Sequence, residues 1–386
     1  MRICLVYDCL YPHTVGGAER VYREVARRLV AEGHQVTYLT MRQWDRGFDP
    51  DYDGVDVITA GPRMKLYDGE GKRRTQPPLV FGLGVFWHLL RHGRSYDVVH
   101  TASFPYFSVL AIALLRPLHR FRVVVDWWEV WTREYWEEYL GRRAGRVGWA
   151  VQRLCARLPQ AAFCFSRLHA RRLREEGLRG ELTVLEGAYP DALEASSVVE
   201  VAEPLVVFAG RHIPEKRVPA LVPAIERLRE RHPDLRCQIF GDGPERPAVL
   251  EAIARSGLDG AIEAPGFVER ERVERALRHA LCMVLPSRRE GYGLVVVEAS
   301  ARGTPSVVVR DPDNAATELI EEGENGFVAA SASPEDLAAA IERVADAGPA
   351  LRERTAAWFA RNERRLSLDS SLDQLASFYA SDSARS

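Results

Sequence analysis

Two glutamates, Glu290 and Glu298, stand eight residues apart in the segment SRREGYGLVVVEAS. Paired carboxylates suggest a glycosidase, but eight residues of helix rise roughly 12 Å, whereas a retaining glycosidase needs carboxyl groups about 5 Å apart. The two side chains fit different parts of one long ligand better. Glu298 could accept hydrogen bonds from a ribose diol, or it could be an ordinary exposed helix glutamate.

The elements that position these carboxylates are a strand and a helix. The run LCMVLPS is typical of a strand, and Gly303 before Thr304-Pro305 is a helix stop, so we predict a helix from about Gly293 to Arg302. The turn Gly291-Tyr292-Gly293 then lies at a helix N-terminus, at the carboxyl end of a strand. Free backbone N–H groups bind phosphate at such positions.

A second candidate loop is FAGRHIPEKR at residues 208–217, which follows the strand pattern LVVFAG. Arg211 offers a planar fork to phosphate and Lys216 a mobile point charge. Together they could neutralise a diphosphate. The alternative is a solvated basic loop.

Strand-like apolar runs alternate with amphipathic helical patterns along the whole chain. This alternation predicts an α/β fold with parallel sheets covered by helices. We expect a first domain at residues 1–190, a polar linker at 191–203 and a second domain at 204–365, two doubly wound, Rossmann-like units facing a cleft.

The composition fits a globular protein: 46% of the 386 residues are hydrophobic, and no stretch has the roughly 18 apolar residues of a membrane span. The N-terminus enters a strand pattern without a signal-peptide layout. Cysteines inside strand-like runs (Cys4, Cys164, Cys237, Cys282) predict reduced core residues. We therefore expect a cytoplasmic protein, and only three lysines among 52 basic residues suggest a bacterial source.

Charge divides the chain in two. Residues 1–190 carry 28 Lys and Arg against 21 Asp and Glu, whereas the remainder carries 24 against 33. A basic first domain could attract an anionic acceptor or the inner face of a membrane, or the charges could simply be spread unevenly over solvated surface. No nucleic-acid partner is expected.

The motifs together resemble those of the retaining GT-B glycosyltransferases of the GT4 type (group 1). EGYGLVVVEASARGTPSVV resembles that family's E-x7-E segment, and FAGRHIPEK resembles its diphosphate loop. GDGP, APGFV, the N-terminal segment YPHTVGGAERVYREVARRLVAEGHQV and the strand DVVH resemble further signatures in the same order. The resemblance covers the whole chain.

The resemblance implies a nucleotide-diphosphate-sugar donor held by the second domain and a hydroxyl acceptor (glycan, lipid or natural product) on the first. It implies that Arg211 and Lys216 contact the diphosphate, Glu298 the ribose, and Glu290 the donor sugar. The donor contacts extend to Gly291, Tyr292, Gly293 and Leu294, to Gly266, Phe267 and Val268 at the base, and to Gly16 and Gly17 near the phosphate. The catalytic group is Glu290, Arg211, Lys216 and His100, the last beside the donor sugar.

For His100 the alternative is a strand-end histidine with satisfied hydrogen bonds, and for Gly16-Gly17 a plain turn. Three departures from the family pattern leave the acceptor open: the segment from Val184 to Tyr189, Arg217 in place of a frequent glycine, and Asp126 at the start of DWWEVW.

No metal or cofactor is expected. The pairs Asp51-Tyr52-Asp53 and Asp311-Pro312-Asp313 match D-x-D but lie in turn-rich sequence, and neither a P-loop nor a G-x-G-x-x-G follows the first strand. Two rival functions stay open: a GT-B-fold sugar-nucleotide epimerase, and a non-catalytic nucleotide-binding protein.

Two further segments carry expectations. In residues 126–158, Val147, Ala150, Val151, Leu154 and Leu158 share one helix face beside arginines, which suits an interfacial helix, an acceptor pocket or a core helix. The amphipathic segment from about Leu366 to Tyr379 is expected to return to the first domain, as the resemblance implies.

Overall fold

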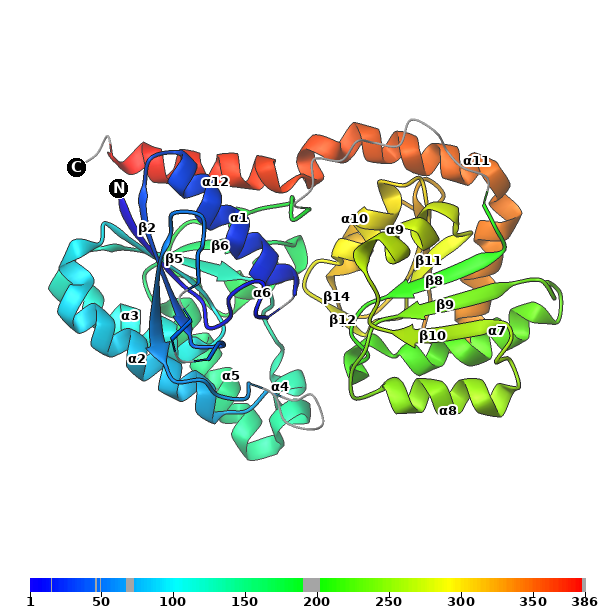
Figure 1. Ribbon diagram of the computed structural model, residues 1–386, viewed down its shortest axis with the longest axis horizontal. Helices are drawn as coiled ribbons and strands as arrows, with labels where there is room; N and C mark the ends of the chain where they lie inside the picture. Colours follow the sequence, from blue (N-terminus) through cyan, green and yellow to red (C-terminus); the bar gives the residue numbers. More distant parts are fainter. Residues whose placement is uncertain (15, 46, 49, 67–72, 190–201, 384–386) are drawn as a thin grey trace. The chain divides into compact units, whose positions relative to one another are not determined.

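The computed structural model describes residues 1–14, 16–45, 47–48, 50–66, 73–189 and 202–383. The chain forms two compact units (Figure 1). Unit 1 contains the described residues up to 189 together with residues 368–383, and unit 2 contains residues 202–367. The linker expected at 191–203 lies almost entirely outside the described residues.

Unit 1 is built on a parallel sheet of seven strands in the order β3-β2-β1-β4-β5-β6-β7. The strand order reverses between β1 and β4, and open α/β sheets bind ligands at the carboxyl ends of strands beside such a switch point. The strands are β1 (Arg2–Val6), β2 (Gln35–Met41), β3 (Asp56–Gly61), β4 (Val98–Ala102), β5 (Arg122–Trp127), β6 (Ala161–Cys164) and β7 (Leu182–Val184).

Helices cover both faces of this sheet: α1 and α12 lie on one side and α2, α3 and α5 on the other (Figure 1). Right-handed crossovers require this division, because the chain moves in opposite directions from β1 to β2 and from β3 to β4. The helices are α1 (Gly17–Ala31), α2 (Gln76–His92), η1 (Gly93–Ser95), α3 (Tyr106–His119), α4 (Arg133–Leu140), α5 (Arg142–Arg157), α6 (Arg167–Glu175) and α12 (Leu368–Ser383).

The last helix, α12, is part of unit 1. Its first turn is fixed by hydrogen bonds to the segment after β7: the Leu368 N–H donates to Tyr189 O at 2.8 Å, and the Ser371 hydroxyl donates to Gly187 O at 2.7 Å. Near its other end Tyr379 is fully buried. The helix is therefore anchored at both ends by residues of unit 1.

Unit 2 has a parallel sheet of six strands in the order β10-β9-β8-β11-β13-β15 and a two-stranded piece, β12-β14. Its strands are β8 (Leu205–Ala209), β9 (Arg236–Phe240), β10 (Ile262–Gly266), β11 (Cys282–Leu285), β12 (Arg289–Glu290), β13 (Ser306–Val309), β14 (Asp313–Asn314) and β15 (Gly326–Ala329). Its helices are η2 (Pro214–Lys216), η3 (Val218–Ala220), α7 (Leu221–Arg229), α8 (Arg246–Ser256), α9 (Arg270–His279), α10 (Leu294–Ser300), η4 (Ala315–Leu319) and α11 (Pro334–Leu366).

The central strands are buried on both faces, as continuous apolar runs in parallel sheets require. Val206, Val207 and Phe208 of β8 are fully buried. The four cysteines predicted inside strands lie in β1, β6, β9 and β11 and are buried and free, which confirms that prediction. In the part of the chain that the structure describes, no helix is long and apolar enough to cross a bilayer.

Helix α5 corrects one of the three interpretations of residues 126–158. Of the predicted apolar face, Val147 and Leu154 are exposed, while the helix buries Gln152 and Cys155 instead. The core-helix interpretation of that face is therefore wrong. The reason is that Gln152 makes four hydrogen bonds to three residues inside the unit, which turn this side of the helix inward.

Candidate active site

The diphosphate loop predicted in unit 2 follows β8 directly. Its backbone is fixed to the neighbouring strand end, because the Gly210 N–H donates to Phe240 O at 3.1 Å and the His212 N–H donates to Asp242 O at 2.9 Å. The loop then forms η2 and reaches Arg217 in the left-handed region, with φ of 48°. Glycine is favoured at such an angle, which explains why the family often has glycine where this chain has Arg217.

The segment from β11 to α10 forms the second loop. Gly293 caps α10 with φ of 102°, and a Cβ there would lie 2.6 Å from the Cβ of Ala316, so both the angle and the space demand glycine. Helix α10 ends at Ser300, close to the predicted stop at Gly303, whose φ is 68°. Glu290 and Tyr292 before the helix are buried.

The two loops meet at an ion pair. Lys216 Nζ contacts the carboxylate of Glu290, with side-chain exposures of 19% and 10%. A second pair runs alongside, Glu215 with Arg289 at 3.6 Å, and the Arg288 N–H donates to Glu215 O at 2.8 Å. Residues 74 positions apart in the sequence thus share one charged cluster.

Neighbouring polar residues hold this cluster in place. Arg217 lies 3.3 Å from the carboxylate of Asp311. Asn314 in β14 donates to Val309 O at 2.8 Å and to Ser287 O at 3.1 Å, which ties the end of β13 to the loop after β11. These contacts make the backbone around Glu290 rigid.

Both D-x-D pairs contribute an aspartate to arginine contacts. Asp311 pairs with Arg217, and Asp53 lies 3.6 Å from Arg23 and 3.4 Å from Arg27. Across the described ranges, no group of three or more His, Cys, Asp or Glu side chains is arranged to hold a metal ion.

The other predicted donor residues lie on the same strand ends and helix of unit 2. Arg211 is exposed, and Phe267 after β10 is 77% exposed, as a residue that contacts a planar base could be. Glu298 is half-buried in α10. Gly266 has φ of 87° and lies close to the Arg246 side chain, while Val268 is half-buried.

The sequence argument missed His212, which lies inside the predicted diphosphate loop between Arg211 and Lys216. It is fully buried and packs edge-on against Phe208, with ring centroids 5.9 Å apart. Burial lowers the pKa of His212, against a smaller opposing effect of the Phe240 backbone and Asp242. Its position in the sequence, next to Arg211 and near Lys216, could have marked His212 as a candidate residue of the site.

In unit 1, His100 of β4 is 1% exposed and lies between two side chains. Its Nδ1 is 2.8 Å from the Tyr379 hydroxyl of α12, and its Nε2 is 2.9 Å from Asp126 Oδ2 of β5. Burial raises the pKa of Tyr379, so its hydroxyl stays protonated while it hydrogen-bonds to His100. Both ring nitrogens therefore face protein partners. One of these is Asp126, which the sequence analysis noted only as a departure from the family pattern.

The predicted pair Gly16-Gly17 lies at the start of α1, where Gly16 is the N-cap and Gly17 the first residue of the helix. Gly16 has an extended φ of −162°, but a Cβ there would lie within 3.2 Å of the buried Glu19 carboxyl carbon, so space favours glycine at this position. A Cβ at Gly17 would meet no atom within 4 Å, so the fold itself does not require glycine there. Open space at Gly17 is compatible with close approach of a ligand.

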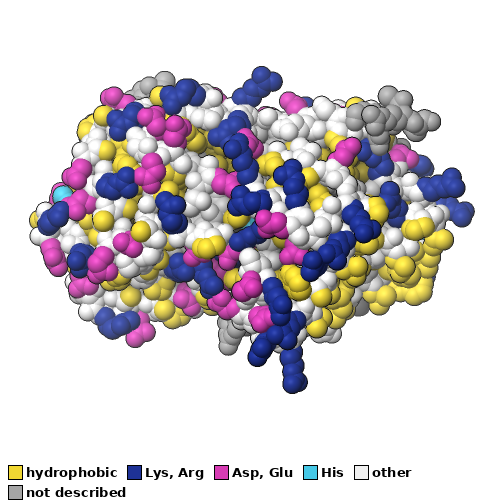
Figure 2. All heavy atoms as spheres, turned by 180° about the vertical axis from the view of Figure 1, so that it is seen from behind, with side chains coloured by type: hydrophobic (Ala, Val, Ile, Leu, Met, Phe, Trp, Pro, Cys, Tyr) yellow, Lys and Arg dark blue, Asp and Glu magenta, His cyan; other side chains and the backbone are white. Residues whose placement is uncertain are grey.

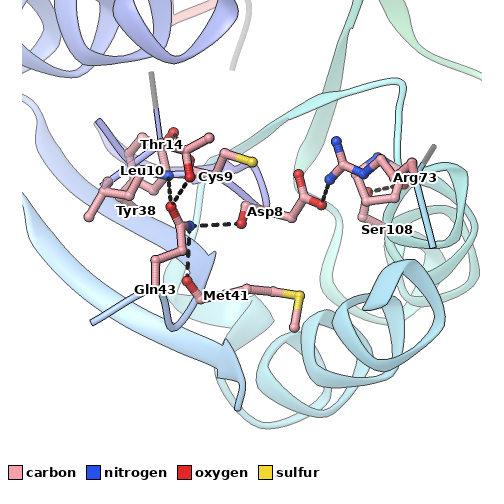
Figure 3. Close-up of polar contacts among 10 residues, drawn as sticks. Asp8, Cys9, Leu10, Thr14, Tyr38, Met41, Gln43, Arg73 and Ser108 are labelled. Carbon is pink, nitrogen blue, oxygen red and sulfur yellow. Dashed lines mark hydrogen bonds and ion pairs between the residues drawn. The ribbon is translucent and has the colours of Figure 1, made fainter. Parts of the chain in front are cut away.

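The side-chain amide of Gln43 holds residues 8–14, which lie before this glycine pair in the chain (Figure 3). Gln43 donates to Asp8 O at 3.0 Å and accepts from the Leu10 N–H at 3.1 Å and from the Thr14 hydroxyl. Asp8, at the carboxyl end of β1, forms an ion pair with Arg73. Residues 8–14 after β1 are thus held by partly buried polar contacts that no sequence motif predicts.

Comparison with known proteins decides the family. Residues 16–188 match the model of the glycosyl transferase 4-like domain, and residues 191–358 match that of the glycosyl transferases group 1. A glycogen synthase of Mycobacterium tuberculosis is 30% identical over 382 residues, covering 92% of this chain and 88% of that protein. This chain belongs to the group 1 (GT4) glycosyltransferases.

Other known proteins are similar to this chain over shorter stretches or in fold. An alpha-D-kanosaminyltransferase of Streptomyces kanamyceticus is 34% identical over 177 residues, 46% of this chain, and the match spans only 45% of that relative's length. The structure of Anabaena Alr3699/HepE in complex with UDP superimposes with a TM-score of 0.72 at 18% identity, covering 99% of this chain and 100% of that one. The predicted GT-B fold with two parallel α/β sheets is confirmed.

Proposed function

We propose that this protein transfers a sugar from a nucleotide-diphosphate sugar to a hydroxyl acceptor with retention of the anomeric configuration. The observation that carries the proposal is the ion pair between Lys216 and Glu290, because it unites the two loops proposed to bind a diphosphate and a sugar. The UDP complex of Alr3699/HepE, a protein of the same fold, supports a nucleotide donor.

Each charged group has a proposed task. Arg211 and Lys216 contact the diphosphate, Glu290 accepts hydrogen bonds from the donor sugar, and Glu298 accepts them from the ribose diol. The backbone of residues 291–294 approaches the donor phosphate, residues 266–268 contact the base, and Gly16 and Gly17 leave room for the donor phosphate. Glu290 also holds the Lys216 ammonium in place before the donor arrives, so less side-chain freedom is lost on binding.

In the proposed reaction, the bond between the sugar C1 and the diphosphate oxygen breaks as the acceptor oxygen bonds to C1 on the same face. The leaving diphosphate gains a full negative charge, which Arg211 and Lys216 stabilise more strongly than they stabilise the bound donor. The acceptor proton passes to a donor phosphate oxygen. No side chain then has to act as a strong base, and no metal is required.

His100 is best assigned a positioning role. The family resemblance implies a catalytic role for it, yet the contacts with Asp126 and Tyr379 engage both of its ring nitrogens. It would act on the donor sugar through the placement of β4, β5 and α12 within unit 1.

The test is a product analysis with purified protein, a panel of sugar nucleotides and hydroxyl acceptors. We expect an acceptor-dependent product whose new linkage has the same anomeric configuration as the donor, read by NMR coupling constants. Isomerisation of the donor without an acceptor would favour an epimerase instead. Nucleotide binding with neither transfer nor hydrolysis would favour a non-catalytic protein.

A finer proposal concerns partners and location. The basic first half of the chain suggests peripheral contact with the inner face of a membrane from the cytoplasmic side.

A further inference from the structure

Helix α2 has apolar side chains on opposite sides. Phe81, Val85 and Leu89 are fully buried against unit 1. Leu79, Leu83, Trp87 and Leu90 are exposed, Leu83 by 57%, and their spacing places them on one stripe along the helix. A helix of this kind at a protein surface needs a second apolar or interfacial partner, because water solvates its outer stripe poorly.

The stripe continues on two neighbouring helices. Helix α2 packs against α3, and α3 packs against α5. Leu114 and Leu118 of α3 and Val147 and Leu154 of α5 are exposed, Leu114 by 67%. Eight of the eleven large hydrophobic side chains found exposed in the described residues lie on these three helices. We call the outward side of α2, α3 and α5 the apolar face, and it appears at the lower right of Figure 2 beside Lys and Arg side chains.

Helix α5 buries a polar side chain and exposes apolar ones, the opposite of a typical surface helix. Gln152 is fully buried, where it accepts hydrogen bonds from the Tyr106 hydroxyl at 3.0 Å and Trp136 Nε1 at 3.1 Å. It also donates to Trp131 O at 2.8 Å. The polar contacts thus fix the inner side of the helix, and they leave Val147 and Leu154 outside as a consequence of the fold.

The charge of the apolar face has one sign. Helices α2, α3 and α5 contain no Asp or Glu, and together they carry seven arginines. Two of these pair with carboxylates, Arg146 with Glu137 and Arg153 with Glu176. Among the described residues, no carboxylate pairs with the other five, which are Arg91, Arg116, Arg142, Arg143 and Arg157.

One contact combines the apolar and the cationic character of the apolar face. The Arg91 guanidinium lies over the Trp87 ring, 5.2 Å from its centroid, so an aromatic ring and a cation share one exposed position at the end of α2. Tryptophan and arginine side chains suit the boundary between headgroups and acyl chains, where one part is apolar and the other is hydrated.

We propose that the apolar face is a docking surface for an anionic lipid membrane. Leucine, valine and tryptophan side chains would enter the boundary between headgroups and acyl chains, while the arginines contact anionic headgroups. A second copy of this chain is a poorer occupant, because a twofold contact would bring the same arginines of both copies together. The inference goes beyond sugar transfer and would stand if another chemistry were found.

The experiment is flotation of the full-length protein with vesicles of phosphatidylcholine containing roughly one-third phosphatidylglycerol, and with vesicles of phosphatidylcholine alone. We expect the wild type to bind the anionic vesicles and to release them as salt rises. The double variant Leu83→Glu and Trp87→Glu should lose binding by at least about tenfold, because two charges would have to enter the apolar layer.

A second variant separates charge from apolar contact. Replacing Arg142 and Arg143 by Gln should weaken binding to anionic vesicles by about fivefold per residue. It should also abolish most of the difference between the two vesicle types. The matched control is Leu250→Glu in α8 of unit 2, an exposed leucine outside the apolar face, which should bind like the wild type.

Three measurements accompany flotation: thermal melting, nucleotide binding and sedimentation. Preserved melting and nucleotide binding in every variant show that a loss of flotation is local. The proposal would be overturned if the wild type failed to bind anionic vesicles, or if the Leu83 and Trp87 variant bound as well as Leu250→Glu. It would also be overturned if sedimentation showed a dimeric wild type and a monomeric Leu83 and Trp87 variant while both proteins still bound vesicles equally well.

Discussion

The two polar clusters, one in each unit, differ in how much solvent they meet. The pair of Lys216 and Glu290 in unit 2 retains 19% and 10% side-chain exposure, whereas His100 and Asp126 in unit 1 retain 1% and 5%. A partly exposed ion pair can exchange partners with an incoming charged ligand. A buried cluster enclosed by protein partners cannot do so without losing structure, so we assign donor chemistry to the first and positioning to the second.

The largest expected effect comes from Lys216→Ala. Loss of one preorganised cation beside a developing anion should lower kcat by about 10²- to 10³-fold, with a smaller change in donor affinity. Arg211→Lys keeps the positive charge but should still lower kcat relative to the wild type, because lysine cannot make the bidentate contact of the guanidinium group. Steady-state kinetics at saturating donor measure both.

The control for Lys216→Ala is Arg227→Ala on α7, an exposed arginine of the same unit paired with Glu335. Because Lys216→Ala removes one cation beside the buried Glu290 carboxylate, the loss of this ion pair could also reduce stability. The double variant Lys216→Ala and Glu290→Gln tests whether such a folding defect contributes, and thermal melting measures it. Turnover by Lys216→Ala within a few-fold of the wild type would remove the leaving-group role.

A smaller effect is expected for Glu298→Gln. A charge-assisted hydrogen bond to the ribose contributes about 1.5 to 3 kcal/mol. Because the Gln amide oxygen can still accept a weaker, neutral hydrogen bond, the variant should bind donor more weakly by up to that amount. A 2′-deoxyribose donor should lose less affinity on the variant than on the wild type. Calorimetric titration of both donors on both proteins completes the cycle, and equal losses would exclude the ribose contact.

Tyr379→Phe sharpens the contrast between the units. Removing its hydroxyl leaves the buried Nδ1 of His100 without this hydrogen bond, which should lower the free energy of unfolding by about 1 to 3 kcal/mol. Turnover below the melting temperature should stay within a few-fold of the wild type. Chemical denaturation and kinetics on the same preparation separate the two. A loss of turnover comparable to that of Lys216→Ala, with unchanged stability, would make His100 a catalytic group after all.

The smallest effect concerns pH and His212. Burial lowers its pKa in the folded protein, whereas in the unfolded chain it titrates near 6.5. Below about pH 6.5 the unfolded state binds a proton that the folded state does not. The free energy of unfolding therefore falls as the pH is lowered, until the pH passes the pKa of His212 in the folded protein. His212→Asn should therefore lose less stability than the wild type between about pH 7 and pH 5.

The comparison for this effect is His232→Asn, at an exposed histidine in the same unit. Denaturant unfolding at several pH values gives the free energies. If His212→Asn and His232→Asn changed the pH dependence equally, burial of His212 would not be the cause.

The sequence predicts the strands and the loops at their ends better than it predicts which side chains meet. Apolar runs such as LVVFAG and LCMVLPS mark β8 and β11, and the residues after them mark the two donor loops. The contact between Lys216 and Glu290 depends on the neighbouring positions of these strands in the sheet. No local pattern contains that information.

Two features of unit 1 escaped prediction for the same reason. His100, Asp126 and Tyr379 come from three distant segments, and only the packing of α12 on the sheet joins them. The periodicity of residues 147–158 predicts which apolar residues share a helix face but not the direction in which that face points. That direction is decided by Gln152, whose partners lie in α3, α4 and the segment before α4.

The most direct test of the account is a thermal-shift panel with UDP, GDP, ADP and dTDP on the wild type and on the double variant Arg211→Ala and Lys216→Ala. A ligand that binds the folded protein raises its melting temperature by mass action. We predict that at least one diphosphate stabilises the wild type and that this stabilisation is largely lost in the double variant. An equal rise in both proteins, or no rise with any of the four, would contradict the assignment of the donor diphosphate to this loop.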